Sequence, residues 1–204
     1  MPTPFSGKLE VICGSMFSGK TEELMHRLKR AGYAKKNIVT IKHKIDNRGS
    51  YSCIVSHSGS KREAYPISSC DEGIKALIEI TSDKTIDIVG IDEIQFFPKE
   101  IVPVIKSLIF SGVRVIVAGL DLDYRGEPFG IVPELMAISD EVTKLRAICV
   151  KCGHEASYTQ RLINDAPASY FDETILVGGH DCYEARCRNC YVIDYRPMLH
   201  EMEA

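Results

Sequence analysis

Eight residues near the start of the chain constrain its fold more than any others: Gly14-Ser15-Met16-Phe17-Ser18-Gly19-Lys20-Thr21. They match the pattern G-x-x-x-x-G-K-[ST]. The apolar segment 9–13 before them is typical of a buried strand, and the segment 21–28 after them is typical of a helix. A glycine-rich turn between a strand and a helix presents backbone N–H groups and a helix N-terminus to phosphate oxygens. The context therefore predicts an α/β protein that binds ATP or GTP.

Two side chains of this loop have expected roles in nucleotide binding. Lys20 would reach the β- and γ-phosphates, and the Thr21 hydroxyl would bind Mg²⁺. The alternative is a chance match in an ordinary glycine turn, which the flanking strand and helix disfavour. The loop predicts nucleotide binding without specifying the reaction.

Strand and helix patterns alternate through the first three quarters of the chain. We expect strands at 38–41, 86–91, 113–118 and 142–145, and helices at 71–80, 99–111 and 133–139. In the first of these helices, Ile74, Leu77 and Ile78 would lie on one face. The polar segment 43–62 has no clear period and is expected to be a loop or hairpin. This alternation predicts a mostly parallel sheet with helices on both faces.

The pattern changes near residue 146, where paired cysteines replace the alternation. We therefore expect a nucleotide-binding domain at 1–146 and a smaller domain at 147–204. A net charge of −3 over 204 residues argues weakly against binding to nucleic acid by electrostatics alone. The sequence has neither an apolar run of membrane-spanning length nor a signal-peptide pattern at its start, so we expect a cytoplasmic protein without a membrane partner.

An acidic pair, Asp92-Glu93, directly follows the expected strand 86–91. An acidic residue at such a strand end helps to hold Mg²⁺ in P-loop proteins, which fits Asp92. Glu93 would then lie near the γ-phosphate and could accept a proton from an attacking hydroxyl. The pair could instead be a solvated strand end or a helix cap. Asp92-Glu93-Ile94-Gln95 also resembles the acidic box of helicase-type ATPases, although such motors generally need two nucleotide-binding lobes.

Four of the eight cysteines form two C-x₂-C pairs, Cys149/Cys152 and Cys187/Cys190. Four thiolates at this spacing are typical of a closed, structural Zn²⁺ site. A pair of redox dithiols is the alternative, and matched pairs favour metal. His154, His180 and Cys182 are spare candidate ligands that we expect to be surface residues. The 34 residues between the pairs exceed a short zinc ribbon, so the intervening segment could cover a small molecule.

Taken together, these motifs resemble the thymidine kinases found in many bacteria, vertebrates and poxviruses. The resemblance covers residues 7–191 and includes the Met-Phe within the P-loop, Asp46-Asn47-Arg48, 92–97, 119–129, both cysteine pairs, and Gly178-Gly179 with Tyr183. It implies a RecA-like α/β domain with a small zinc domain. It also implies ATP-dependent phosphorylation of the 5′-hydroxyl of thymidine and deoxyuridine, a homotetramer, inhibition by dTTP, and no nucleic-acid partner.

The resemblance assigns roles to individual residues. It implies that Glu93 is the catalytic base, that Lys20 and Arg48 act on the phosphates, and that Thr21, Asp92 and, through water, Asp46 surround Mg²⁺. The implied ATP-binding residues are Gly14, Ser15, Met16, Phe17, Ser18, Gly19, Lys20, Thr21, Asp46, Asn47, Arg48, Asp92, Glu93, Ile94 and Gln95.

The loop between the cysteine pairs would be the family's lasso over the nucleoside. The implied substrate contacts are Met16, Leu120, Tyr124, Phe129, Thr174, Ile175, Leu176, Val177, Gly178 and Tyr183. Tyr124 occupies a position where the family commonly has Phe, so its additional hydroxyl requires a hydrogen-bond partner or water. Phe96 and Phe97 are expected to pack in the core or an interface.

Overall fold

A parallel sheet forms the centre of the molecule. The structure, a computed structural model, describes residues 7–46, 52–55, 59–83, 85–174 and 182–194. Its six-stranded sheet has the order β5-β2-β6-β7-β1-β8, and every neighbouring pair is parallel. The strands are β1 (Leu9–Gly14), β2 (Ile38–His43), β5 (Tyr65–Ile67), β6 (Ile88–Asp92), β7 (Arg114–Gly119) and β8 (Glu141–Leu145). The fold confirms the α/β class predicted from the alternating pattern.

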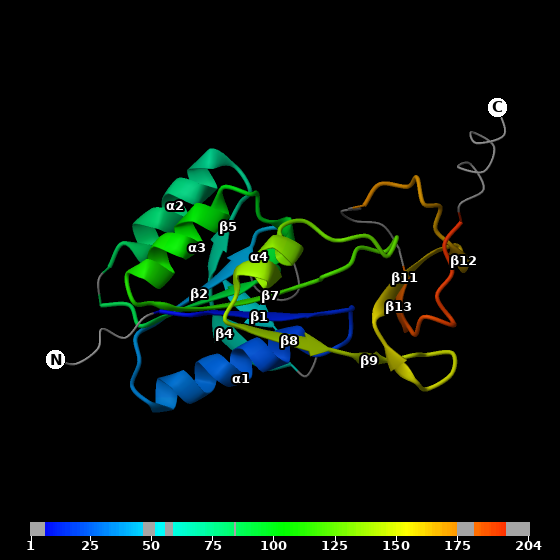
Figure 1. The fold of residues 1–204 in the computed structure, drawn as a ribbon, viewed down its shortest axis with the longest axis horizontal. Coiled ribbons are helices and arrows are strands. Elements are labelled where there is room, and N and C mark those ends of the chain that lie inside the picture. Colours follow the sequence, from blue (N-terminus) through cyan, green and yellow to red (C-terminus); the bar gives the residue numbers. More distant parts are fainter. Residues whose placement is uncertain (1–6, 47–51, 56–58, 84, 175–181, 195–204) are drawn as a thin grey trace.

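Helices cover both faces of this sheet (Figure 1). On one face lies α1 (Lys20–Tyr33); on the other lie α2 (Asp71–Thr81), α3 (Ile101–Phe110) and α4 (Val132–Ile138). Alternate β1 residues point to opposite faces, so Val11 joins the core under α2, α3 and α4, whereas Ile12 packs with Leu24 and Leu28 of α1. Burial on both faces explains why β1 is apolar at nearly every position.

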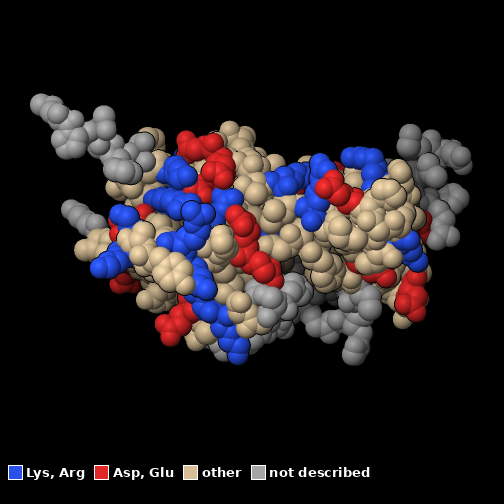
Figure 2. Space-filling model, turned by 90° about the horizontal axis from the view of Figure 1, so that it is seen from below, with Lys and Arg blue, Asp and Glu red and all other residues tan. Residues whose placement is uncertain are grey.

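Glu10 is the exception in β1, because it is a fully buried carboxylate. Arg114 Nε donates to its Oε1 at 2.6 Å and Arg27 Nη1 donates to its Oε2 at 2.8 Å, while Lys8 Nζ lies 2.5 Å from Oε1. Burial alone would raise the pKa of Glu10, but the bonds from Arg114, Lys8 and Arg27 outweigh it and lower the pKa to about 2. On the face of the molecule at the bottom of Figure 1, Lys and Arg are interspersed with Asp and Glu (Figure 2).

Short antiparallel strands form the part of the chain that contains the cysteine pairs. Beyond the carboxyl ends of the parallel strands (Figure 1) lie a two-stranded and a three-stranded sheet. Their strands are β9 (Ala147–Ile148), β10 (Glu155–Ala156), β11 (Tyr158–Ile163), β12 (Ala166–Pro167) and β13 (Cys182–Arg186). Asn164 and Asp165, both with positive φ, make the tight turn from β11 to β12. The division into domains at 1–146 and 147–204 stays a prediction.

Several details differ from the sequence-based expectations. The segment 43–62 contains β3 (Cys53–Val55), which pairs antiparallel with β4 (Lys61–Glu63) at its end, in line with the expected loop or hairpin. The edge strand β5 was missed, because three residues that include Pro66 carry almost no strand pattern.

The apolar face predicted for α2 is only partly buried. Leu77 is buried and Ile74 is partly buried, but Ile78 is 49% exposed. The buried face is centred on Gly73, Leu77 and Thr81. Gly73 lies so close to Ser68 O that any side chain there would collide with it. Among the described residues, no helix is long and apolar enough to cross a bilayer.

Candidate functional site

The P-loop begins where β1 ends. Gly14 has φ +142°, and a Cβ atom there would lie 2.3 Å from Leu145 O, so only glycine fits. Phe17 and Gly19 follow with φ of 64° and 85°, both left-handed. These three conformations turn the chain sharply before α1 starts at Lys20. The result is a compact loop at the N-terminus of α1, as the sequence motif predicts.

Lys20 and Thr21 make polar contacts that hold this loop together. Lys20 Nζ donates to Ser15 O at 2.7 Å, and Ser18 Oγ donates to the same carbonyl at 2.8 Å. The buried Thr21 hydroxyl donates to Asp92 Oδ2 at 3.0 Å. The P-loop and the end of β6, 71 residues apart, therefore place a hydroxyl beside a carboxylate. Oxygen ligands of this kind suit Mg²⁺.

Glu93 stands next to this pair in an unusual backbone conformation. Its φ and ψ are 54° and 42°, and left-handed residues other than glycine cluster at functional sites. Gln95 Nε2 donates to Glu93 Oε2 at 2.6 Å, while Gln95 Oε1 accepts from the Leu120 N–H at 3.0 Å. The Gln95 side chain is thus directed at Glu93 and Leu120. This chain of bonds links the acidic pair to the loop after β7.

His43, which the sequence analysis did not select, lies close to Glu93. Its ring contacts Phe97 edge-on with centroids 5.0 Å apart, and its Nδ1 accepts from the Ile45 N–H. The opposite nitrogen, Nε2, lies 2.7 Å from Ser69 Oγ. Burial lowers the pKa of His43, which the negative charge of Glu93 opposes. No local motif marks this residue, because Ser69, Glu93 and Phe97 are distant from it in the sequence.

The predicted base-pocket residues lie in contact with other parts of the site. The Met16 N–H donates to Thr159 Oγ1 at 3.0 Å, which connects the P-loop to β11. Phe129 packs edge-on against Phe96, with centroids 5.8 Å apart. Phe97 is buried in the core, as expected. Thr159 was missed because it lies 143 residues from Met16 and belongs to no motif.

Tyr124 is buried, and its hydroxyl finds the partners that the sequence analysis required. The oxygen lies 2.7 Å from Asp172 O and 2.9 Å from Ser169 O. Burial raises the pKa of this hydroxyl, so it keeps its proton and can donate. The loop after β7 is thereby joined to the segment that precedes Thr174.

The remaining predicted contacts are only partly described. Lys42 Nζ lies 3.4 Å from Asp46 Oδ2, and both side chains are buried. Tyr183 pairs with Arg161 across β13 and β11. Asn47, Arg48, Ile175, Leu176, Val177 and Gly178 lie outside the described residues.

The two cysteine pairs come together in space. The sulfur atoms of Cys149, Cys152, Cys187 and Cys190 all lie within 4.8 Å of one another. Four sulfurs at about 2.3 Å from a tetrahedral Zn²⁺ would be about 3.8 Å apart, so the cluster fits this ion. Burial opposes ionisation of Cys149, but N–H groups of Cys187, Lys151 and Cys152 point at its sulfur and lower its pKa to about 6. The His154 N–H lowers the pKa of Cys152, but hydrogen bonds with the neighbouring thiols outweigh it and raise the pKa values of Cys152 and Cys190. One thiolate in the cluster therefore opposes the formation of others until a cation binds.

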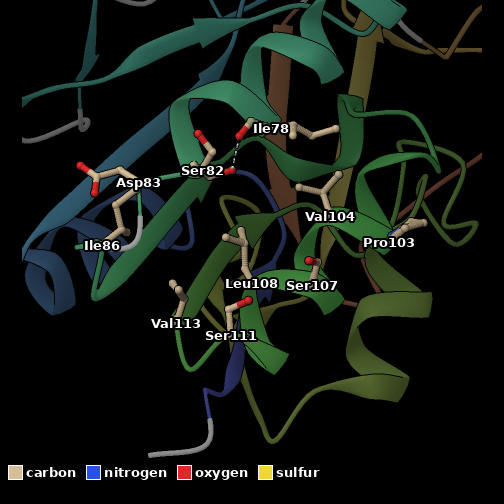
Figure 3. A pocket seen from close by; sticks show the side chains of 11 residues that line it. Ile78, Ser82, Asp83, Ile86, Pro103, Val104, Ser107, Leu108, Ser111 and Val113 are labelled. Carbon is tan, nitrogen blue, oxygen red and sulfur yellow. Dashed lines mark hydrogen bonds between the residues drawn. The ribbon is translucent and has the colours of Figure 1, made fainter.

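A separate groove of about 630 Å³ lies between α2 and α3 (Figure 3). The half-exposed Ile78 lines it together with Val104 and Leu108. Its other lining residues include Ile86 and Val113, which precede β6 and β7. The groove is therefore at the amino ends of these strands, whereas the P-loop and Asp92 are at the carboxyl ends. It contributes no residue to the candidate site.

A parallel sheet with a P-loop after β1, an acidic pair at the end of β6 and a four-cysteine cluster that could hold a metal ion define the class of P-loop nucleotide-binding proteins. Comparison with known proteins narrows this class. The sequence profile described as "Thymidine kinase" matches residues 7–191. A thymidine kinase from Coprothermobacter proteolyticus is 57% identical over 181 residues, which cover 89% of this chain and 88% of the relative. The chain belongs to the thymidine kinase family.

Proposed function

We propose that this protein is a thymidine kinase that transfers the γ-phosphoryl group of ATP to the 5′-hydroxyl of thymidine, and also of deoxyuridine. The observation that carries the proposal is the Thr21–Asp92 hydrogen bond with Glu93 beside it, in a chain that belongs to the thymidine kinase family. This geometry supplies a nucleotide loop, oxygen ligands for a cation and an adjacent carboxylate. Phosphoryl transfer requires these elements.

The donor would bind at the P-loop. Backbone N–H groups of the P-loop other than that of Met16, together with the N-terminus of α1, would face the phosphates, and Lys20 would add a positive charge near the γ-phosphate. Lys20 would exchange its present bond to Ser15 O for a phosphate oxygen. Thr21 and Asp92 would hold Mg²⁺, which neutralises charge on the β- and γ-phosphates. Asp46, Asn47 and Arg48 are proposed to complete the phosphate and Mg²⁺ contacts by resemblance.

Glu93 is the proposed catalytic base. The Glu93 carboxylate would accept the proton of the 5′-hydroxyl as the hydroxyl oxygen bonds to the γ-phosphorus and the bond to the ADP leaving oxygen breaks. Gln95 holds one carboxylate oxygen, Oε2, and so sets the direction in which Oε1 points. Positioning of this kind supplies much of the rate in phosphoryl transfer, because the reaction needs little covalent assistance.

Thymine recognition is assigned to Met16, Leu120, Tyr124, Phe129 and the lasso backbone from Thr174 to Gly178, with Tyr183 against the nucleoside. Peptide N–H and C=O groups match the N3–H and carbonyl edge of thymine. Cytosine presents a different pattern of donors and acceptors and would leave buried polar groups unpaired, which can lower kcat/KM by several orders of magnitude. Exclusion of water by the lasso would limit ATP hydrolysis.

The four cysteines are proposed to hold one Zn²⁺ as a structural ion. A site closed by four sulfurs leaves no coordination position for substrate. The ion would fix both ends of the segment between the cysteine pairs. A homotetramer, inhibition by dTTP and a cytoplasmic location are further proposals that follow from the family resemblance and the expectations of the sequence.

The decisive experiment measures ATP consumption with thymidine, deoxycytidine, deoxyguanosine or no acceptor, and identifies the product by mass. We expect dTMP to form only with thymidine. Glu93→Gln should abolish turnover while ATP binding persists. ATP hydrolysis without nucleoside dependence but stimulated by single-stranded DNA would overturn the kinase proposal. Wild-type turnover in Glu93→Gln would overturn the role of Glu93.

A further inference from the structure

The segment just before Thr174 turns its carbonyl oxygens inward onto two buried donors. Asp172 O and Ser169 O lie 2.7 and 2.9 Å from the Tyr124 hydroxyl, and Tyr170 O lies 3.4 Å from it. The next carbonyl, that of Glu173, accepts from Arg161 Nη1 at 2.7 Å. Carbonyl oxygens only accept hydrogen bonds, so this arrangement of the backbone depends on the Tyr124 O–H and the Arg161 N–H as donors.

Tyr124 and Arg161 also support each other. The Arg161 guanidinium is fully buried and lies 5.1 Å from the centroid of the Tyr124 ring, a cation–π distance. Arg161 O accepts from the Ala168 N–H at 3.1 Å, which ties the beginning of the same segment to β11. The two side chains therefore bond the backbone of residues 169–173, and the Arg161 carbonyl bonds Ala168 at the start of the segment.

The two anchoring residues belong to parts of the chain that the proposed function places around thymidine. Tyr124 belongs to the loop after β7, where the Leu120 N–H bonds Gln95 beside Glu93. Arg161 lies on β11, directly opposite Tyr183 of β13 and two residues after Thr159, which bonds the P-loop. A change at Tyr124 or Arg161 would thus be transmitted to the backbone at Thr174 without touching the P-loop.

We propose that Tyr124 and Arg161 are positioning residues that fix the backbone of residues 169–173 and thereby set the affinity of the enzyme for thymidine. This inference rests on the proposed function. It assigns the Tyr124 hydroxyl, which a phenylalanine at this position would lack, to the backbone of residues 169–172 and not to the nucleoside.

The test uses the full-length, zinc-loaded enzyme with Tyr124→Phe, which removes a single oxygen atom. We expect the thymidine KM and the thymidine Kd measured without ATP to rise about tenfold, the range for loss of one buried hydrogen bond. The kcat and the ATP KM should stay within about twofold. Hydrogen exchange of the amides at 169–173 should accelerate without any nucleoside present. Tyr33→Phe, the same change at a 76% exposed residue, is the matched control and should leave all four measurements unchanged.

Arg161→Lys keeps a charge but loses the planar donor geometry, so it provides a second variant. It should raise the thymidine KM and accelerate the same amide exchange. A Tyr124→Phe enzyme with wild-type thymidine affinity would overturn the inference, whatever its exchange rates. Unchanged exchange at 169–173 in both variants would also overturn it. Wild-type enzyme that forms no dTMP would instead refute the proposed function, so the two failures are distinguishable.

Discussion

Replacement of Gln95 by Met would test whether the bond to Glu93 serves catalysis. Met has about the same length as Gln but donates no N–H, so Gln95→Met removes the 2.6 Å bond to Glu93 Oε2 with little change in packing. It also removes the acceptor of the Leu120 N–H. Both partners are held by Gln95, which is only 4% exposed.

The expected magnitude follows from the type of bond that is lost. A hydrogen bond to a charged group contributes about 1.5–3 kcal/mol. If that energy positions the base in the transition state, its loss lowers kcat by about 10- to 100-fold, because about 1.4 kcal/mol corresponds to tenfold in rate. The Kd of ATP should change little, since the P-loop contacts are separate. Gln95→Glu should be at least as damaging, because it places a second carboxylate against Glu93.

Steady-state kinetics with saturating ATP and thymidine would measure the effect, with thermal unfolding to normalise for stability. The matched control is Gln160→Met. Gln160 is equally buried, and its amide makes two bonds to Val192, at 2.8 and 2.9 Å, away from Glu93. The control should lose stability but keep kcat within about twofold. A stable Gln95→Met enzyme with wild-type kcat would refute the reasoning.

Two further predictions concern stability. The lowered pKa of Glu10, about 2 against an ordinary 4.5, corresponds to about 3 kcal/mol of stabilisation above pH 4.5, lost as the pH falls from 4.5 towards 2. The difference in unfolding free energy between wild type and Glu10→Gln, from urea titrations, should therefore shrink over that range; a difference independent of pH would contradict this assignment. Cys152→Ser should reduce bound zinc below one ion per chain, lower the thermal midpoint by about 5–10 °C and raise the thymidine KM. An unchanged midpoint after verified zinc loss would exclude a structural role.

Much of the architecture could be predicted because it depends on local patterns. The strands that form β1, β6 and β7 are short apolar runs, and a helix pattern follows each within the span that a parallel crossover needs. The predicted elements matched the structure to within one or two residues at most ends. Where the pattern was weak, the prediction failed, because β5 is a three-residue edge strand that contains Pro66. Ile78 has the predicted helical spacing but lines the groove of Figure 3.

The sequence by itself determined the chemical parts of this protein. Glycines at positions 14 and 19, a Lys-Thr pair, an acidic pair after a strand and two C-x₂-C pairs each carry a requirement that only a few residue types meet over a short span. These requirements are local, so a pattern reveals them without any knowledge of distant contacts.

Only the tertiary structure decided how these parts are joined. The Thr21–Asp92 bond, the Leu120–Gln95–Glu93 chain and the contact from Met16 to Thr159 connect segments between 25 and 143 residues apart. The anchoring of residues 169–173 by Tyr124 and Arg161 is of the same kind. Arg161 carries no motif signal, because the Glu173 carbonyl that it bonds is a backbone group that any residue could supply. Its position follows from packing between elements, which the order of residues along the chain does not display.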